Sequence, residues 1–248
     1  MDFYINVFHK CGSNWFRPVF KNIAKCTSGH YFPHTKNSFG INSPVSFGEE
    51  HVFNVFPGGN IKKVQRLTEN LNSSNLILCV RDPRDALVSQ FFSWRNSHRN
   101  NTNSILQYRE RFQQMSPVEG MKTIVNENVF VFANQMLPWS QEIFSVPVHE
   151  RNFKIVKYEE LQSDFIGTIQ RLSTFFDLQL SLVDIESIEK TNRFDKKAKR
   201  EKGQEDQYSH YRKGIVGDYM NYFDSELREL FDEKYGWLVE LLDYDSRK

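Results

Sequence analysis

Short apolar runs along the chain predict the strands of a β-sheet. The runs FYINVF (3–8), NLILCV (75–80) and FKIVKY (153–158) are rich in β-branched or aromatic residues and are bounded by polar residues. HVFNVF (51–56), which is closed by a Pro-Gly-Gly turn, is a weaker fourth candidate. Continuous apolar runs of this length are typical of strands buried on both faces, so we expect a mostly parallel sheet.

Apolar residues at helical spacing predict helices between these strands. The predicted helices cover residues 15–26, 61–71, 84–97, 159–176 and 224–242, and residues 103–144 hold at least two more. Strands that alternate with helices favour a single α/β domain over residues 1–248, with a central sheet flanked by helices. The segments 27–50 and 195–211 are expected to form loose loops, because they are rich in turn-forming and charged residues respectively.

Composition narrows the class of protein. Of the 248 residues, 39 % are hydrophobic and 25 % are charged, and the net charge of +1 provides no overall attraction to nucleic acid or to an anionic membrane. The three cysteines form no C-x-x-C pair, so we expect no disulfide framework and no metal site, and a reducing cytoplasm fits best. No apolar run of about 18 residues predicts a membrane span, and the first apolar run, interrupted by Asn6, does not resemble a signal peptide.

The loop after the first predicted strand has the composition of a phosphate-binding loop. HKCGSN (9–14) supplies a lysine, a glycine that permits close backbone approach, and two small polar side chains, and a predicted helix follows. A helix that starts at the carboxyl end of a parallel strand directs N–H groups at an anion. An ordinary strand-to-helix turn is the alternative. The loop does not match G-x-x-x-x-G-K-[ST], which disfavours a nucleoside triphosphatase.

Two further stretches could hold a phosphate. In LILCVRDPRDALVSQFFSW (76–94), Arg81 leaves a strand end and Ser89 lies on the helix that follows, so that a guanidinium and a hydroxyl can converge. A capped helix with an Arg–Asp surface pair is the alternative for this stretch. In YRKGIVGDYMNYF (211–223), a basic pair precedes Gly214, and a charged loop that caps the last helix is the alternative.

These three stretches, in this order, resemble the motifs of the cytosolic sulfotransferase family. That family has P-K-S-G-T-T-W where this chain has HKCGSNW, R-x-P-x-D-x-x-x-S where it has RDPRDALVS, and R-K-G-x-x-G-D-W where it has RKGIVGDY. The resemblance extends over nearly the whole chain and implies a P-loop-like sulfotransferase fold. It also implies an enzyme that transfers a sulfuryl group from 3′-phosphoadenosine-5′-phosphosulfate (PAPS), which leaves as adenosine 3′,5′-bisphosphate (PAP).

The resemblance further implies the residues that bind the donor. They are Lys10, Cys11, Gly12, Ser13 and Asn14 at the 5′-phosphosulfate, Trp15, Tyr158 and Phe194 at the adenine, and Arg81, Ser89, Arg212, Lys213 and Gly214 at the 3′-phosphate. Lys10 would also be catalytic, because it would neutralise charge on the oxygen that bridges phosphorus and sulfur as that bond breaks. Simple core packing is the alternative for Trp15 and Tyr158, and an anchor in a basic run is the alternative for Phe194.

The general base departs from the family pattern. The family has a catalytic His in K-[ST]-H-x-P, and alignment on Pro57 puts Val55 at that position. Strand alternation places His51 and Glu49 on the same face as Val55, so these two are the first candidates for the base. Glu50 and His34 are further candidates, and a purely structural role at the strand edge is the alternative for His51.

The acceptor and the assembly are less defined by the sequence. We expect a small-molecule acceptor that is sulfated on a hydroxyl or on an amine or guanidinium nitrogen, with a tailoring step in secondary metabolism as one candidate role. The dimer motif K-x-x-x-T-V-[ED] is absent from MNYFDSELRELF, so the family-type dimer is not predicted. Two rival functions remain: a non-catalytic module that binds PAPS or another nucleotide, and a divergent P-loop small-molecule kinase.

Overall fold

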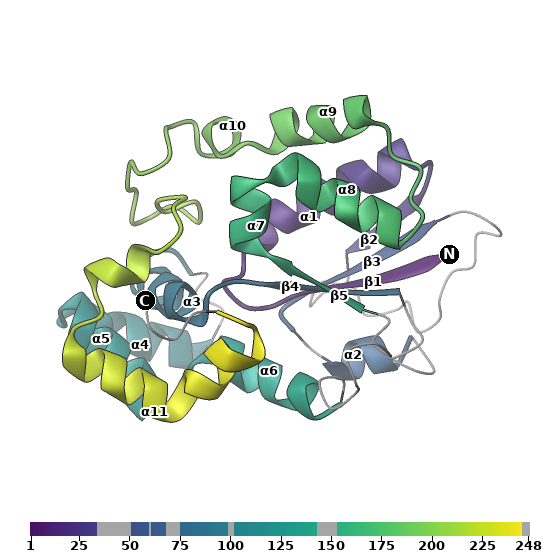
Figure 1. Ribbon diagram of the computed structural model, residues 1–248. Helices are drawn as coiled ribbons and strands as arrows, with labels where there is room; N and C mark the ends of the chain where they lie inside the picture. The colour runs from purple at the N-terminus through teal and green to yellow at the C-terminus, as the bar shows by residue number, and fades with distance from the viewer. Residues whose placement is uncertain (34–50, 60, 68–74, 99–101, 143–152, 245–248) are drawn as a thin grey trace. The chain divides into compact units, whose positions relative to one another are not determined.

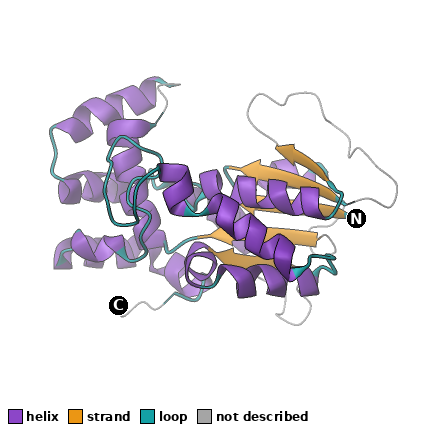
Figure 2. Cartoon of the chain, turned by 90° about the horizontal axis from the view of Figure 1, so that it is seen from above, coloured by secondary structure: helices purple, strands orange, loops and turns teal. Residues whose placement is uncertain are grey.

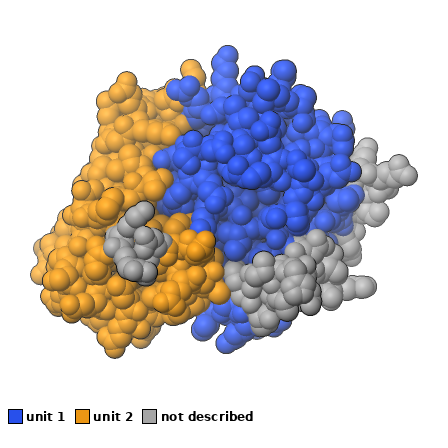
Figure 3. Space-filling view, in the orientation of Figure 1, with its two compact units in different colours: residues 1–81, 135–193 blue, residues 82–134, 194–248 orange. Residues whose placement is uncertain are grey.

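The computed structural model describes residues 1–33, 51–59, 61–67, 75–98, 102–142 and 153–244 (Figure 1). These residues pack as two compact units, which are coloured separately in Figure 3. Unit 1 contains residues 1–81 and 135–193, and unit 2 contains residues 82–134 and 194–248. Unit 1 holds the sheet, and the chain enters unit 2 directly after the fourth strand.

A five-stranded, all-parallel sheet forms the centre of unit 1. The strands are β1 (Asp2–Val7), β2 (His30–Pro33), β3 (Val52–Pro57), β4 (Asn75–Val80) and β5 (Phe153–Lys157), in the order β2-β3-β1-β4-β5. This arrangement confirms the predicted α/β class with helices on both faces of the sheet (Figures 1 and 2). Strand β2 was not predicted, because its four residues lie in a segment whose composition suggested a loop.

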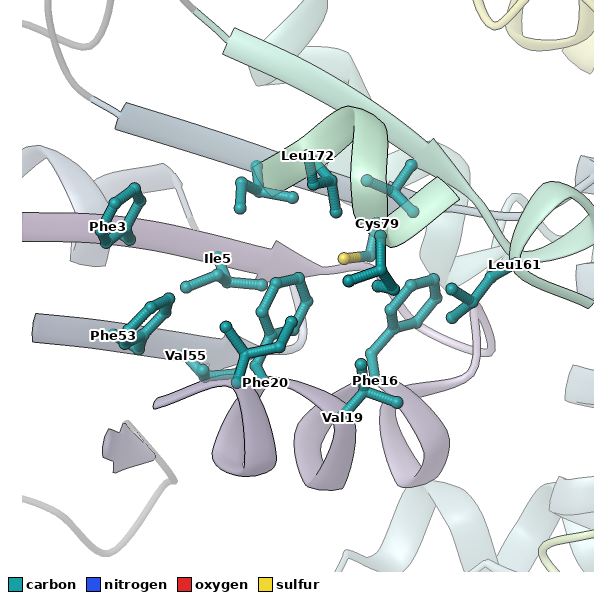
Figure 4. Packing of buried hydrophobic residues seen from close by; sticks show 14 of the residues in the cluster. Phe3, Ile5, Phe16, Val19, Phe20, Phe53, Val55, Cys79, Leu161 and Leu172 are labelled. Atoms are coloured by element: carbon teal, nitrogen blue, oxygen red, sulfur yellow. The ribbon is translucent and has the colours of Figure 1, made fainter. Parts of the chain in front are cut away.

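One face of the sheet packs against four helices. They are α1 (Ser13–Cys26), α7 (Tyr158–Ser163), α8 (Phe165–Phe175) and α9 (Leu182–Asn192). Alternate residues of β1 and β3, among them Phe3 and Phe53, meet the apolar side of α1 in a fully buried cluster (Figure 4). The predicted helix over 159–176 is in fact two helices, because the Asp164 side chain accepts a hydrogen bond from the Gly167 amide (3.0 Å) and caps a new helix.

The opposite face of the sheet packs against α2 (Ile61–Gln65) and α6 (Val131–Glu142). Trp139 of α6 lies edge-on to Phe8 and donates from its indole nitrogen to the Gly59 carbonyl (2.9 Å). Pro138 lies inside α6. Helix α2 ends at Gln65, before the predicted end at residue 71.

Unit 2 is helical. It contains α3 (Pro83–Phe92), the π-helix η2 (Ser93–Ser97), α4 (Asn103–Gln113), α5 (Pro117–Asn126), the first turn of α6, α10 (Phe194–Ala198), the 3₁₀ helix η4 (Asp218–Asn221) and α11 (Ser225–Leu241). The predicted helix over 84–97 therefore changes pitch at residue 93. Pro117 opens α5, where a reciprocal capping box between Ser116 and Glu119 satisfies the first amides. Within the described part of the chain, no helix combines the length and apolar character needed to cross a bilayer.

Candidate functional site

The loop between β1 and α1 has a backbone suited to an anion. Lys10 and Gly12 have positive φ angles of 62° and 90°, and Cys11 between them does not. Backbone that alternates in this way turns successive N–H groups toward one point. Helix α1 then begins at Ser13 without a side-chain cap and without an acidic residue in its first turn. Its first N–H groups and the positive end of its dipole therefore suit a negative group.

Neighbouring elements of unit 1 hold this loop in place. The His9 amide donates to the side-chain oxygen of Gln135 on α6 (2.9 Å), and the Phe8 amide donates to the Cys79 carbonyl of β4 (3.3 Å). The Cys11 amide closes the turn on the Phe8 carbonyl (3.1 Å). Burial raises the pKa of the Cys11 thiol well above its usual range, so this side chain fills space and does not supply a thiolate.

Four of the sequence-predicted residues meet at the carboxyl edge of the sheet. The Arg81 guanidinium lies 4.7 Å from the centre of the Tyr158 ring, and the Trp15 ring meets the same tyrosine edge-on with centroids 5.2 Å apart. Gly12 backs onto this ring so closely that a Cβ atom there would lie 2.8 Å from it. Tyr158 is the first residue of α7 and not the last residue of β5, because the strand ends at Lys157.

The second motif, RDPRDALVS, crosses from unit 1 to unit 2 after Arg81. The Asp82 side chain caps α3 by accepting from the Arg84 amide (2.9 Å), and it also accepts from the Arg84 guanidinium (2.7 and 3.0 Å). The sequence suggested a surface Arg–Asp pair as the alternative here. The pair exists, but both residues are buried, so it fixes the start of the helix. Ser89 lies half-buried on the same helix.

The third motif, RKGIVGDY, forms an ion cluster around a buried carboxylate. Asp218, of which 1 % of the side chain is exposed, accepts from Lys213 (2.7 Å), from Arg212 and from the Asn221 amide group (2.9 Å). Arg212 also pairs with Glu205 (2.5 Å) and lies over the Phe92 ring of α3, 4.4 Å from its centre. The two cations are therefore held in fixed directions by protein carboxylates.

Phe194 and Gly214 are brought together in the same unit. Gly214 has a φ of 68°, and a Cβ atom there would lie 2.4 Å from the Phe194 ring, so only glycine lets the two approach. The Tyr211 ring lies nearly perpendicular to this ring, with centroids 6.3 Å apart, and the Arg200 guanidinium lies over it, 5.6 Å from its centre. The predicted residues thus fall into two sets, one at the sheet edge of unit 1 and one beside α3 in unit 2.

Comparison with protein families identifies the chain. A family model described as "Sulfotransferase domain" matches residues 62–243. The chain belongs to the sulfotransferase family. The matched residues include Arg81, Ser89 and Tyr158 and the RKG motif, whereas the loop from Lys10 to Trp15 precedes them.

Curated sulfotransferases are distant relatives of this chain. Sulfotransferase 2A6 of Mus musculus is 27 % identical over 178 residues, which cover 66 % of this chain and 56 % of the relative. Sulfotransferase 6B1 of Danio rerio is 23 % identical over 243 residues, which cover 94 % and 77 %. The chain thus spans little more than half the length of the first of these curated sulfotransferases.

Solved sulfotransferase-type structures share the fold. Mouse sulfotransferase SULT7A1 complexed with PAP superposes with a TM-score of 0.60 at 18 % identity, over 99 % of this chain and 86 % of that chain. Retinol dehydratase in complex with androsterone and inactive cofactor PAP superposes with a TM-score of 0.59 at 16 % identity, over 98 % and 81 %. This likeness confirms the predicted sulfotransferase fold.

The structure does not bring His51 to the loop between β1 and α1. His51 precedes β3 and lies beside Met1, because Val52 pairs with Asp2 at the amino end of the sheet. Six residues at about 3.3 Å each separate it from the carboxyl edge, which is about 20 Å. Burial lowers its pKa, and its ring packs edge-on against Phe3 and Phe53. This position favours the structural alternative for His51 and gives no support to its role as the base.

The remaining candidates for the base divide into two groups. Glu49, Glu50 and His34 lie outside the described residues. Val55, at the aligned position of the family His, is fully buried in the cluster against α1. A side chain at that position faces the core and not the loop after β1.

Sequence reasoning assigned no role to three residues that shape the site. Gln135 holds the loop between β1 and α1, Asp218 holds the pair Arg212 and Lys213, and Asp85 binds the backbone of the third motif. Both aspartates lie inside the quoted motifs, Asp85 in RDPRDALVS and Asp218 in RKGIVGDY, so their place beside the basic residues was the signal that could have identified them. Gln135 follows the loop by more than a hundred residues and carries no local pattern that links it to His9.

Replacement of Gly12 tests the contact between the loop and Tyr158. We expect Gly12→Ala to lower the free energy of unfolding by about 2 kcal/mol or more, because it adds left-handed strain and a clash with the Tyr158 ring. Urea denaturation measures this loss. Gly203→Ala is the matched control, since Gly203 has the same φ of 90° and no neighbouring atom within 4 Å. Equal losses in both variants would refute a contribution from the Tyr158 contact.

Replacement of Val55 tests whether the aligned His position is buried. We expect Val55→His to be less stable than Val55→Leu by about 1–3 kcal/mol, because the imidazole would be buried without partners in an apolar cluster. The comparison of two larger side chains separates polarity from overpacking. A His variant as stable as the Leu variant in urea would show that this position opens toward polar surroundings.

Protonation of Asp218 should weaken the third motif. Burial alone would raise the pKa of Asp218, but hydrogen bonds from Lys213 and Arg212 hold it below its ordinary value. This stabilisation is complete above the unfolded pKa of about 3.9 and is lost as the pH falls through the lower folded pKa. We therefore expect Asp218→Asn to be less stable than wild type near neutral pH, and the gap to shrink in acid. Urea titrations across this range measure it, and a gap independent of pH would contradict the ion cluster.

Proposed function

We propose that the protein is an enzyme that transfers a sulfuryl group from PAPS to a hydroxyl or to an amine or guanidinium nitrogen of a small molecule. The observation that carries this proposal is the meeting of Gly12, Trp15, Arg81 and Tyr158 at the carboxyl edge of a parallel sheet in a member of the sulfotransferase family. In parallel α/β folds this edge is where ligands bind.

The chemistry of the residues fits a nucleotide with two separated phosphate groups. The loop from Lys10 to Asn14 offers N–H groups and a lysine for the 5′-phosphosulfate, and Trp15 and Tyr158 offer aromatic surface beside it. Arg81, Ser89 and the pair Arg212 and Lys213 would take the 3′-phosphate, for which guanidinium and hydroxyl donors are well suited. The two solved structures reported above are complexes with PAP.

Within this proposal the chain contributes position and charge. Lys10 would lie near the bridging oxygen and stabilise the negative charge that builds on it as the sulfur–oxygen bond breaks. Group transfer of this kind depends mainly on alignment and on stabilisation of spread negative charge. PAPS is a co-substrate and PAP a product in this reaction. In the described part of the chain, no three His, Cys, Asp or Glu side chains lie close enough together to hold a metal ion.

A PAPS-binding module without catalysis is the second candidate function. The burial of Val55 and the distance of His51 from the loop favour it, because neither of these two positions places a base beside the loop between β1 and α1. A general base contributes about 10²–10⁴-fold to a rate. A divergent P-loop kinase has less support, since Ser13 and Asn14 follow Gly12 where that motif has a Lys-[ST] pair after its last glycine.

The acceptor is a small molecule in this proposal. Androsterone and retinol are named as the molecules bound to retinol dehydratase, which shares the fold. We expect segments 27–60 and 98–150 to line an acceptor pocket, and parts of both, including 34–50 and 143–150, lie outside the described residues. We propose a cytoplasmic tailoring step in secondary metabolism as the setting.

Calorimetry with nucleotides tests the donor site. We expect PAP to bind more tightly than AMP or ATP–Mg, and Arg81→Ala to weaken PAP by about 10- to 100-fold through the loss of a charge-assisted phosphate contact. Arg111→Ala is the matched control, because Arg111 is exposed and pairs only with surface groups near Glu127. A preference for ATP–Mg over PAP would overturn the proposal in favour of a kinase.

Turnover of PAPS separates the enzyme from the binding module. Release of PAP in the presence of a panel of phenols, alcohols, amines and guanidines is the expected result for the enzyme. Tight PAP binding without acceptor-dependent release for any of these classes would favour the non-catalytic module.

A further inference from the structure

Asp85 makes an unusual link between distant parts of unit 2. Its carboxylate is 1 % exposed, and its two oxygens accept hydrogen bonds from the Gly217 amide and the Tyr219 amide, both at 2.9 Å. These partners lie more than 130 residues further along the chain. A buried carboxylate is costly unless it is hydrogen-bonded, and bonds from backbone amides to an ionised oxygen are among the stronger ones. Asp85 therefore fixes the backbone on either side of Asp218.

The same backbone turn directs the basic pair. Gly217 has a φ of 78° and caps the 3₁₀ helix η4, which begins at Asp218. Asp218 in turn accepts from both Arg212 and Lys213. The direction of the two cations is thus set by Asp218, and the place of Asp218 is set by the turn that Asp85 holds.

Asp85 also shares a face of α3 with Ser89. Residues four apart on a helix lie above one another, so Asp85, Ser89 and Phe92 line one side of α3. Asp85 binds the third motif one turn before Ser89, and Phe92 supports the Arg212 guanidinium one turn after it. Ser89 therefore lies between two residues that both contact the RKGIVGDY segment.

We propose that Asp85 is the positioning residue of the 3′-phosphate subsite, which aligns the Ser89 hydroxyl with Arg212 and Lys213. The inference rests on the proposed function, since it concerns how the donor's 3′-phosphate is distinguished. Asp85 does not touch the donor in this role. It acts by holding the turn at 217–219 in register with α3.

The preference for PAP over AMP tests this role, because the two ligands differ only in the 3′-phosphate. Calorimetry on the full chain would compare wild type, Asp85→Asn and Asp85→Ala. Asp85→Asn keeps the size of the side chain but can accept only one of the two amides well. We expect it to reduce the PAP-to-AMP preference about tenfold or more, which corresponds to about 1.4 kcal/mol, while the affinity for AMP changes little.

A control separates positioning from stability. Ser116→Ala removes a cap from α5 in the same unit and should cost about 1 kcal/mol of folding free energy without a contact to the third motif. Loss of folded protein lowers the apparent affinity for both ligands alike, so this variant should retain the wild-type preference. Urea denaturation of every variant confirms that the binding experiments use folded protein.

A double-mutant cycle adds a second readout. If Asp85 aligns the basic pair, Arg212→Ala should weaken PAP less in the Asp85→Asn background than in wild type. An unchanged PAP-to-AMP preference in folded Asp85→Asn, or additive effects in the cycle, would overturn the inference while the donor site stands. Absence of any PAP preference in wild type would instead overturn the proposed function, and the inference with it.

Discussion

The parallel pairing of β1 with its two neighbours is the constraint on which the candidate site depends. Val7 pairs with Pro57 on one side and with Cys79 on the other, and Val80 pairs with Lys157 one strand further along. Each of these residues is the last or the next-to-last of its strand, so the loops that follow all leave from one edge. The loop between β1 and α1, Arg81 and Tyr158 are therefore neighbours, although they are up to about 150 residues apart in the sequence. A shift of one residue in any pair would exchange the two faces of that strand, disrupt the packing against the helices on both sides and move the loop that follows it.

The second level of organisation is electrostatic, and it lies in unit 2. Two buried aspartates have different kinds of partner: Asp85 accepts from two backbone amides, whereas Asp218 accepts mainly from cations. Backbone amides cannot move independently of the fold, so Asp85 fixes a position. Cationic side chains can exchange one anion for another, so Asp218 holds Arg212 and Lys213 in place without excluding a second anion, such as the phosphate of the proposed donor. A neutral side chain at either position would lose one of these properties.

The elements that sequence reasoning found are those with strong local patterns. β1, β4 and β5 are apolar runs bounded by polar residues, and α1 and α11 follow long amphipathic repeats. The break at Asp164, the four-residue β2 and the π-helix after Phe92 depend on a single cap or on tertiary packing. The pattern of hydrophobic residues in a short window does not predict such features. The motif residues could be named because three stretches resemble, in order, the motifs of the sulfotransferase family. Gln135 could not, because its bond to the His9 amide is visible only once α6 is placed against the sheet.

The placement of His51 shows why a shared face is a weak argument for a shared site. Alternation along a strand correctly places residues 51, 53 and 55 on one face, but it does not say how far each residue lies from the carboxyl end of the strand. Ligands of open α/β sheets bind outside the carboxyl ends of the strands, and His51 lies at the other end, so its shared face with Val55 gives no support to a role as the base. Val55 is near the correct end, yet the face that it shares with Phe53 is the one covered by α1. Strand β3 carries no titratable side chain, so the proposed sulfuryl transfer would use a base carried by a loop or an acceptor nucleophilic enough to react without one. An amine would satisfy the second condition more readily than an alcohol, because it attacks as a neutral nucleophile and can lose its proton after the bond to sulfur has formed.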